Sequence, residues 1–592
     1  MGLILKTKFL NIEAEESGII SIYDNIVEME WNENKDFLPV NVLLEDGTSI
    51  IPSSFKLVEI PNAIIMEAVF DEDPSIKLRM NLRVISPGDR FDVIINMNKD
   101  FPFKEVEFFK NAFPVEENTG GSILIPHGLG KILSVDREFD ENRFSCSDSL
   151  SMGMYGIIND ASALLAIFDD PSMCLSIYKK NRVLYSSFIT SKIPQRVQFR
   201  LFPEGDLISL ILGYREYVKR KNYIVPWGEK LKEREDIKNI LSAPVFELCE
   251  DKDDIILEFI GHIKRDVGLS LSSFLDQTED PDEHFNELMK IIRESGYFLL
   301  INKDLEIQSD DHVVKMEFYK SYSGGITGSS NRKDGIYPYI KGAYELNERF
   351  LPFLDFYLIR GQVFPYPSFY PVFEIAYGDT SKIITKIDNI DEIDLAFLTS
   401  LLFGRGLFFS KEILPRDAYW KEEDLRRGKD LPIFMMGENG WGMNMHPFDI
   451  LIKNLNEIFI PFMSLIQGKR IERFEEIDDK GKVYYTRFEN DVEVLINYSP
   501  GLYEYFSVSY GKVFLPFKGF IVSSNKFLSF YAYGINGYKN NRPSLFSIRS
   551  LDGNDFKSTK KIKVYHAFGP EQFKFMRKII NVEEEKVFFT RS

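Results

Sequence analysis

The N-terminal third of the chain alternates between polar and apolar positions with the period of β-strands. Segment 77–84, KLRMNLRV, switches between charged or polar and apolar residues at almost every step, which is the pattern of a half-buried strand. Similar runs follow one another as far as RVQFRLF at 196–202, and turn-forming pieces such as SPGD and PEGD separate them. The pattern therefore predicts an N-terminal antiparallel β-sandwich over residues 1–206.

The pattern changes to a helical spacing at residue 207. Four apolar residues, Leu207, Ile211, Tyr214 and Val218, recur three or four positions apart. The basic run 219–221 follows, where positive charge complements the dipole at the end of a helix. We predict a connecting helix and linker over 207–240.

Strand-like and helix-like segments alternate in the middle of the chain, from 241 to 466. This alternation is typical of a parallel sheet or barrel, so we predict a (β/α)8-type barrel. We count only about seven strands and stretch 303–335 is weakly patterned, so we expect the barrel to be incomplete. The predicted strands include 297–302, 313–319 and 370–379, and the predicted helices are 282–296, 338–350, 391–403 and 448–466.

A strand pattern returns in the last part of the chain. Short apolar runs such as VYYTRF at 483–488 and KIKVYHAF at 561–568 are joined by polar turns. Residues 489–491, END, have the composition of a hairpin turn. We predict a C-terminal β-sandwich over 467–592, which makes the whole a multidomain protein of α/β and all-β parts.

Length and charge agree with several folded domains and exclude some partners. At about 150 residues per domain, 592 residues correspond to three or four units. A net charge of -18 repels phosphate backbones and anionic lipid surfaces, so we expect neither nucleic acid nor a membrane as partner.

The composition predicts neither a metal nor another cofactor. The three cysteines form no CxxC pair, and the six histidines are scattered without metal-ligand spacing. The N-terminus lacks the long apolar core of a signal peptide, and no stretch approaches the ~20 apolar residues of a membrane span. We therefore expect a cytoplasmic protein.

Candidate catalytic residues are the carboxylates at predicted strand ends in the barrel, because barrel chemistry takes place at the carboxyl ends of the strands. Glycoside cleavage needs two such groups, one protonated and one acting as nucleophile or base. Any single acidic residue among 90 is more often a solvated charge. The candidates are Asp276, Glu317, Asp355, Glu374 and Asp379.

The segment YPVFEIAYGD at 370–379 carries the most informative of these carboxylates. Burial of Glu374 among apolar neighbours would raise its pKa, which suits a general acid. The structural alternative is a carboxylate bonded to Arg360 or Arg405. Sugar contacts are expected from Tyr377, Arg360 and the loop GENGWGM with Trp441, which leads to His446.

Three segments resemble the clan of the endo-α-N-acetylgalactosaminidases. YREYVKRKNYIVPWGEKLKER at 214–234 is similar to the helix that these proteins place between sandwich and barrel, and YPVFEIAYGD is similar to a late barrel strand. The segment that starts with RFEEIDDKGKVYYTRF, at 473–488, is similar to the start of their C-terminal domain. The resemblance implies a galactose-mutarotase-like sandwich, a (β/α)8 barrel and a C-terminal β-sandwich.

The resemblance also implies an activity, a retaining hydrolysis of oligosaccharides or glycoconjugates. It would place a nucleophilic Asp after the fourth barrel strand and an acid/base Glu after the fifth. Glu317 is the best positional match to the acid/base, whereas the segment that would carry the nucleophile is shortened here. The alternative is a catalytically degenerate relative that binds carbohydrate or has a structural role.

Overall fold

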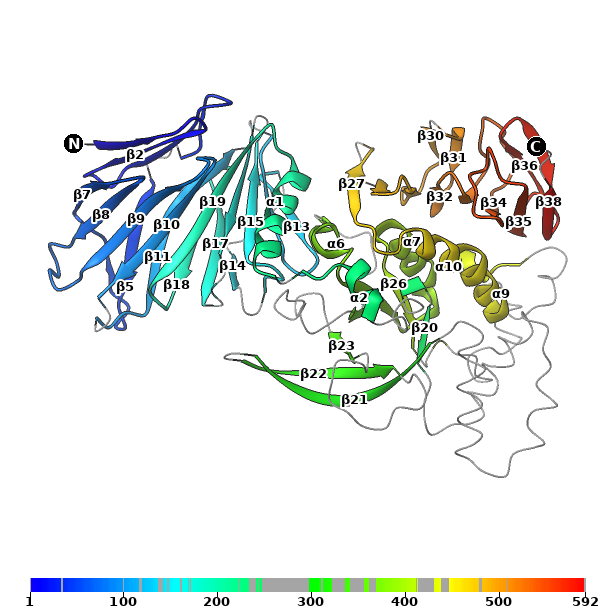
Figure 1. Ribbon diagram of the computed structural model, residues 1–592, viewed down its shortest axis with the longest axis horizontal. Coiled ribbons are helices and arrows are strands. Elements are labelled where there is room, and N and C mark those ends of the chain that lie inside the picture. Colours follow the sequence, from blue (N-terminus) through cyan, green and yellow to red (C-terminus); the bar gives the residue numbers. More distant parts are fainter. Residues whose placement is uncertain are drawn as a thin grey trace. The chain divides into compact units, whose positions relative to one another are not determined.

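The chain forms two compact units in the computed structural model (Figure 1). The first comprises Met1–Tyr223, Ala343–Phe350 and Pro367–Ala376, and the second comprises Ile224–Gly342, Leu351–Tyr366 and Tyr377–Ser592. The residues that the structure describes are 2–32, 36–98, 101–116, 120–136, 142–145, 149–159, 162–168, 170, 172–222, 224–233, 241–242, 244–247, 298–309, 312–321, 336–340, 356–360, 369–410, 413, 431–437, 447–478, 482–507 and 509–589.

Three antiparallel sheets build the first unit. A nine-stranded sheet has the order β13 (Lys131–Ser134), β12 (Ser122–Ile125), β15 (Met154–Ile158), β16 (Ser162–Ile167), β19 (Gln195–Pro203), β10 (Arg90–Met97), β9 (Leu78–Ile85), β8 (Ala63–Val69), β7 (Ser54–Ile60). A six-stranded sheet has the order β14 (Asn142–Ser145), β17 (Met173–Lys180), β18 (Val183–Thr190), β11 (Glu105–Glu116), β5 (Leu38–Leu43), β6 (Ser49–Ile50). A four-stranded sheet contains β1 (Gly2–Lys6), β2 (Leu10–Glu15), β3 (Ile20–Asp24) and β4 (Met29–Glu30).

The apolar positions of these sheets form one core that is rich in phenylalanine. The rings of Phe91 and Phe199 stack with centroids 4.9 Å apart, and those of Phe108 and Phe188 with centroids 5.4 Å apart. Strand β9 alternates buried and more exposed residues along most of its length, as the pattern of 77–84 predicts. The strand prediction for this part of the chain is therefore confirmed.

Helix α1 (Leu207–Arg220) follows the last strand of the first unit, at the predicted place. The Asp206 carboxylate caps its N-terminus by accepting a hydrogen bond of 2.8 Å from the Ser209 backbone N–H. Leu210, Ile211, Tyr214 and Val218 form its buried face, which explains the helical spacing in the sequence.

A closed barrel of seven strands lies within the described part of the second unit. The strands are β20 (Val245–Glu247), β21 (Phe298–Ser309), β22 (His312–Ser321), β23 (Ile336–Ile340), β24 (Phe356–Arg360), β25 (Lys382–Ile387) and β26 (Gly406–Phe409). Strand β22 runs antiparallel to β21 and β23, whereas the other neighbours are parallel. This differs from a (β/α)8 barrel, in which all strands are parallel.

The stagger of this barrel can be followed in the register. From Phe298 on β21, the paired positions lead through β20, β26 and β25 to Arg360 on β24. From Leu358, two residues earlier on β24, they lead through Tyr339 and Glu317 to Asp304 on β21, so the six residues from Phe298 to Asp304 and the two on β24 give an offset of eight. A shear of eight is also that of (β/α)8 barrels.

Helices and a C-terminal sheet complete the second unit. The helical segments are α2 (Trp227–Glu233), η4 (Ile390–Glu392), α7 (Ile393–Phe403), η5 (Ile433–Met435), α9 (Pro447–Asn454), the π-helix η7 (Leu455–Phe459) and α10 (Ile460–Leu465). Helix α7 contacts β25 and β26 of the barrel and also two strands of the C-terminal sheet. The helices predicted at 391–403 and 448–466 are confirmed.

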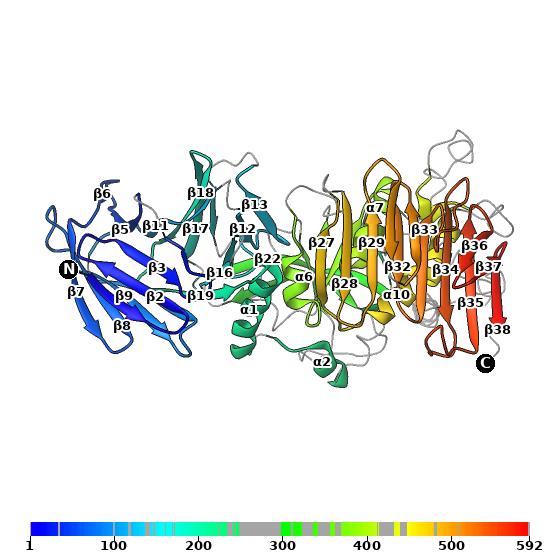
Figure 2. The same ribbon diagram turned by 90° about the horizontal axis from the view of Figure 1, so that it is seen from above.

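The C-terminal sheet has eight antiparallel strands, which lie side by side in Figure 2. Their order is β27 (Ile471–Glu476), β28 (Val483–Phe488), β29 (Glu493–Asn497), β32 (Gly519–Ser523), β33 (Phe527–Ala532), β34 (Ser544–Ser550), β35 (Lys561–Phe568), β38 (Glu585–Phe589). Two hairpins are separate, β30 (Tyr503–Ser507) with β31 (Gly511–Leu515) and β36 (Gln572–Phe575) with β37 (Lys578–Asn581). The turn predicted at 489–491 joins β28 to β29, with Asp491 at a φ of 59°.

Two predictions for the middle of the chain are wrong. Residues 336–340 form strand β23, so the helix predicted at 338–350 does not include its first residues, and 341–350 lie outside the described residues. Residues predicted as a late barrel strand at 370–379 contain helix α6 (Val372–Tyr377). The predicted helix 282–296 lies outside the described residues, and the four-part domain division stays a prediction.

Contacts with the sandwich explain why 370–379 is not a barrel strand. Residues up to Ala376 belong to the first unit, and Lys131 forms a β-bridge with Phe369. The backbone N–H of Tyr370 donates to the Gly130 carbonyl at 3.2 Å, and that of Phe373 donates to the Leu129 carbonyl at 3.3 Å. The segment is thus hydrogen-bonded to the edge of the nine-stranded sheet.

Candidate functional site

Several of the predicted site residues cannot be placed. Asp276, Asp355, Trp441 and His446 lie outside the described residues. Their proposed roles stay predictions. The remaining candidates fall into two groups, one on the barrel strands and one on or directly after helix α6.

Within the barrel group, Arg360 lies at the carboxyl end of its strand, where barrel enzymes carry their chemistry, whereas Glu317 lies in the middle of β22. Glu317 on β22 pairs in register with Tyr339, the residue before the last of β23. Arg360 is the last residue of the neighbouring strand β24 and pairs with Lys386 of β25. Tyr339 in turn pairs with Leu358 of β24, so the register places Glu317 level with the position two residues before Arg360.

A second carboxylate on these strands was missed by the sequence analysis. Strands β21 and β22 lie side by side in Figure 1, and Asp304 on β21 pairs directly with Glu317 on the antiparallel strand β22. Residues that face each other across an antiparallel pair have Cβ atoms about 4.5–5.5 Å apart and lie on the same face of the sheet. The available signal was the sequence Asp310-Asp311 between two alternating runs, which marks a hairpin turn.

Charged residues also gather where β25 ends. The ammonium of Lys386 lies 3.7 Å from the carboxylate of Asp388, which follows the strand directly. The same ammonium lies 5.5 Å from the centre of the Phe408 ring on the adjacent strand β26. This end of the barrel therefore carries both cations and carboxylates.

The opposite end of β25 carries a different kind of lysine. Lys382 begins the strand, its ammonium donates to the Leu241 carbonyl, and burial lowers its pKa to about 7. The amino ends of barrel strands form the face that is associated with stability, so we assign this lysine a structural role.

The α6 group does not sit on a barrel strand. Glu374 and Tyr377 are buried on the helix, with 5% and 0% of their surface exposed. Asp379 lies in the turn after it, where its carboxylate pairs with Arg470 at 3.7 Å and its carbonyl accepts from the Trp227 N–H at 2.7 Å. The contacts of Asp379 tie together the start of the second unit and its C-terminal sheet. The catalytic and sugar-binding roles predicted for these three residues stay predictions.

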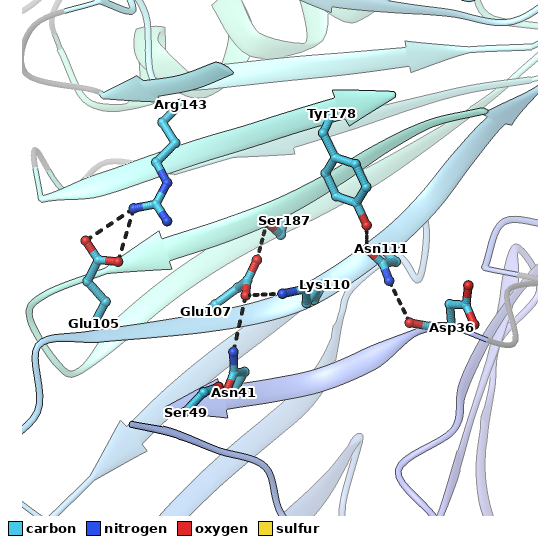
Figure 3. Close-up of polar contacts among 10 residues, drawn as sticks. All are labelled: Asp36, Asn41, Ser49, Glu105, Glu107, Lys110, Asn111, Arg143, Tyr178 and Ser187. Atoms are coloured by element: carbon cyan, nitrogen blue, oxygen red, sulfur yellow. Dashed lines mark hydrogen bonds and ion pairs between the residues drawn. The ribbon is translucent and has the colours of Figure 1, made fainter. Parts of the chain in front are cut away.

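A further group of polar residues lies on the six-stranded sheet of the first unit (Figure 3). Glu107 accepts hydrogen bonds from the Ser187 hydroxyl and the Lys110 ammonium, both at 2.9 Å. Asn111 accepts from the Tyr178 hydroxyl and donates to the Asp36 carbonyl at 2.7 Å. The residues of this group thus bind one another across neighbouring strands.

The group of polar residues lies beside an irregular stretch of strand β11. Phe109, Asn111 and Phe113 all have φ between 51° and 61°, a region that residues other than glycine rarely adopt. The register of β11 against β18 shifts in the same stretch. The polar contacts hold this irregular strand to β18 and β5, so we assign them a structural role.

Metal sites and membrane spans are absent from the described part of the chain. Its histidine, cysteine and acidic side chains form no group of three or more that could hold a metal ion. No helix within it combines the length and apolarity needed to cross a membrane.

Comparisons with known proteins find similarity in fold. The α-N-acetylgalactosaminidase NagBb from Bifidobacterium bifidum, in complex with GalNAc, aligns with a TM-score of 0.56 and 12% identity, over 84% of this chain and 98% of that one. Its ligand-free structure gives a TM-score of 0.55 and 11% identity over the same shares. The galactosidase domain of AgaSK aligns over 99% of this chain and 98% of that one, with a TM-score of 0.34 and 9% identity. This TM-score is too low to indicate a shared fold. No protein-family model and no curated protein matches the sequence.

Proposed function

We propose that this protein is a glycoside hydrolase that cleaves an oligosaccharide or glycoconjugate by a retaining mechanism with two carboxylates. The observation that carries the proposal is the fold similarity to an α-N-acetylgalactosaminidase over 98% of that enzyme's length. The closed barrel, which carries Asp304 and Glu317 at paired positions on adjacent strands, supports it. The first substrate class to test is therefore α-linked N-acetylgalactosamine and galactose.

Glu317 and Asp304 form the catalytic pair of this proposal. Retaining glycosidases hold their two carboxyl groups about 5–5.5 Å apart, and directly opposed residues on antiparallel strands have Cβ atoms about 4.5–5.5 Å apart, from which two carboxyl groups can reach that separation. Glu317 also has the best positional match to the acid/base residue of the similar clan. Asp304 then takes the role of the nucleophile that the sequence analysis could not assign.

The reaction follows from these two roles. Protonated Glu317 gives its proton to the glycosidic oxygen as the bond to the anomeric carbon breaks. The Asp304 carboxylate bonds to that carbon and forms a glycosyl-enzyme. Glu317, now ionised, takes a proton from water, and the resulting attack on the anomeric carbon releases the sugar and restores Asp304.

The other predicted residues have subsidiary places in the proposal. Arg360, at the carboxyl end of β24, is proposed to contact the substrate, as are Tyr377, Trp441 and His446. The carboxylates Asp276, Asp355, Glu374 and Asp379 are alternatives for one member of the pair, so their variants belong in the same test.

The test is a panel of nitrophenyl glycosides that starts with the α-anomers of N-acetylgalactosamine and galactose. Glu317→Gln is expected to lower kcat by about 10²–10⁴-fold, because it removes the general acid. Asp304→Gly is expected to remove hydrolysis and to regain turnover with added azide, which replaces the lost nucleophile. Proton NMR of the first product is expected to show retention of anomeric configuration.

Glu306→Gln is the matched control, because Glu306 lies two residues along β21 from Asp304. It is expected to keep most of the wild-type activity. Full activity of both the Asp304 and Glu317 variants would overturn the assignment of the pair. Saturable glycan binding without any turnover by the wild-type protein would instead favour the degenerate, carbohydrate-binding relative.

A further inference from the structure

A strongly basic pocket lies on the first unit, apart from the carboxylates discussed above. It has a volume of about 490 Å³ and lies beside strands β9, β10 and β19 and the end of helix α1. Its lining contains no carboxylate. The cations that line it are Arg83, Arg90, Arg196, Arg220 and Lys221.

A buried carboxylate holds two of these arginines in place. Asp92 is 0% exposed, and its two oxygens accept from Nη2 of Arg83 at 2.6 Å and from Nη2 of Arg196 at 2.9 Å. Gln198 donates to the same carboxylate at 3.2 Å. Both guanidinium side chains remain about half exposed, at 48% and 46%, so each keeps N–H groups for another partner.

The strand register explains how these side chains meet. Strand β10 lies between β9 and β19, and its Asp92 pairs with Arg83 on β9 and with Gln198 on β19. Arg196 lies two residues along β19 from Gln198, on the same face of the sheet. The arrangement therefore fixes the two guanidinium groups before any ligand arrives, which lowers the entropy cost of binding.

The charge of the pocket is opposite to that of the whole protein. Arg90 is paired with Asp89 at 3.2 Å, and Arg83 and Arg196 share Asp92. The lining of the pocket thus contains five cations and no carboxylate, in a chain whose net charge is -18. The ammonium of Lys221 lies 5.4 Å from the centre of the Tyr217 ring, and this cation–π contact helps to position the side chain.

The dipole of helix α1 explains the positions of only two of the five basic residues. Arg220 and Lys221 lie at its C-terminus, where basic residues are favoured in any helix. Arg83, Arg90 and Arg196 lie on strands and converge on the same pocket from the other side. We propose that this pocket binds a phosphate or sulfate group, either as the free ion or as an ester on a small molecule.

The chemistry of the lining supports a tetrahedral oxyanion. Guanidinium groups offer planar pairs of N–H donors that match phosphate and sulfate oxygens, and such charge-assisted hydrogen bonds are stronger than neutral ones. A single carboxylate ligand would use fewer of the five cations. The inference is independent of the proposed hydrolase, since it concerns binding alone.

Isothermal titration calorimetry on the full chain at low ionic strength tests the proposal, with inorganic phosphate, inorganic sulfate, galactose 6-phosphate and galactose as probes. Saturable binding of at least one charged probe is expected, with no binding of galactose at the same site. Tighter binding of the ester than of both free ions would identify the ester as the source, and the reverse would identify the free ion.

Two double variants and one control locate the site. Arg83→Gln with Arg196→Gln, and separately Arg220→Gln with Lys221→Gln, are each expected to weaken binding at least tenfold. The second pair is exposed at the end of helix α1 and not on the strands of the sheet, so its result stands if the first variant fails to fold. Arg79→Gln is the control, because Arg79 lies on the same strand and face as Arg83 but outside the pocket.

The control is expected to change the affinity less than twofold. Absence of saturable binding for all three charged probes would overturn the proposal. An equal loss of affinity in Arg79→Gln and in the pocket variants would also overturn it, because it would show a general charge effect rather than a site.

Discussion

Lys563 on strand β35 lies 2.7 Å from the buried carboxylate of Glu457 on the π-helix η7. Arg549 on β34 approaches the same carboxylate at 3.3 Å, and Lys453 on α9 approaches it at 3.4 Å. Glu457 thus joins the helical segment 447–465 to the eight-stranded sheet of the same unit. A short π-helical segment inside an α-helix is rare and is frequently found at functional sites.

Removal of Lys563 is expected to destabilise the second unit. Lys563→Met leaves Glu457 buried with two cations instead of three, so we expect a loss of about 1–3 kcal/mol in the free energy of unfolding. Urea unfolding followed by circular dichroism measures it. Lys561→Met on the same strand, at an exposed position, is the control and is expected to stay within about 0.5 kcal/mol. Equal effects of the two variants would contradict the role of Glu457.

The Asp394–Lys518 pair makes a prediction about pH. Asp394 on α7 is buried, and its carboxylate lies 2.9 Å from the Lys518 ammonium. Burial raises the pKa of Asp394, and Lys518 opposes that rise. A raised pKa in the folded state means that this group favours folding at low pH and that its contribution is lost as the pH rises through the folded value.

Lys518→Met should therefore cost more stability at neutral pH than in acid. At neutral pH the variant must either bury an unpaired carboxylate or protonate it, whereas protonation of Asp394 becomes easier as the pH falls. We expect a loss of about 3 kcal/mol at pH 7 and a clearly smaller loss at pH 4, measured by urea unfolding at both values. In the Asp394→Asn background the same substitution should have little pH dependence. A cost independent of pH in the wild-type background would show that the pair contributes no electrostatic stabilisation.

The sequence predicted those elements that have one buried and one exposed face. Strand β9 and helix α1 each keep a clear period, because water covers one side of them. Helix α7 is buried on almost every side and shows no such period, yet Gly404 with a φ of 69° marks its end as a left-handed cap. The division into all-β and α/β parts followed from these patterns.

The errors have a common physical cause, which is pairing between residues far apart in sequence. Segment 370–377 is buried throughout, so its composition fits a strand or a helix equally well, and contacts with Leu129 and Gly130 decide the outcome. Asp304 is one acidic residue among many until the register places it opposite Glu317. A single sequence shows neither contact.

Gly130 gives a test of how segment 369–376 is attached to the sandwich. Gly130 has a φ of 132°, and a Cβ atom there would overlap with the Tyr370 carbonyl and the Val372 side chain. Gly130→Ala is expected to destabilise the first unit by about 3 kcal/mol or more, because both the backbone and the packing must change. Gly47→Ala, at a φ of 88° with nothing nearby, is expected to cost about 1 kcal/mol. Thermal unfolding distinguishes the two, and equal costs would show that the close contact at Gly130 can relax.

Lys382 gives the last prediction, which concerns alkaline pH. Burial lowers its pKa to about 7 from an ordinary value of 10.5, so the folded state favours the neutral amine. A depressed lysine pKa contributes stability above pH 10.5 that is lost as the pH falls towards 7. Over that window the wild-type protein should gain roughly 4 kcal/mol from this group as the pH rises.

Lys382→Met removes this contribution, so the free energy of unfolding should rise less steeply with pH between 7 and 10 in the variant than in the wild type. Lys386→Met on the same strand is the control, since its ammonium pairs with Asp388 instead, and it should keep the wild-type slope. Urea unfolding at closely spaced pH values gives the three slopes. An unchanged slope in Lys382→Met would mean that its amine stays charged in the folded protein, with water or a carboxylate near enough to stabilise it.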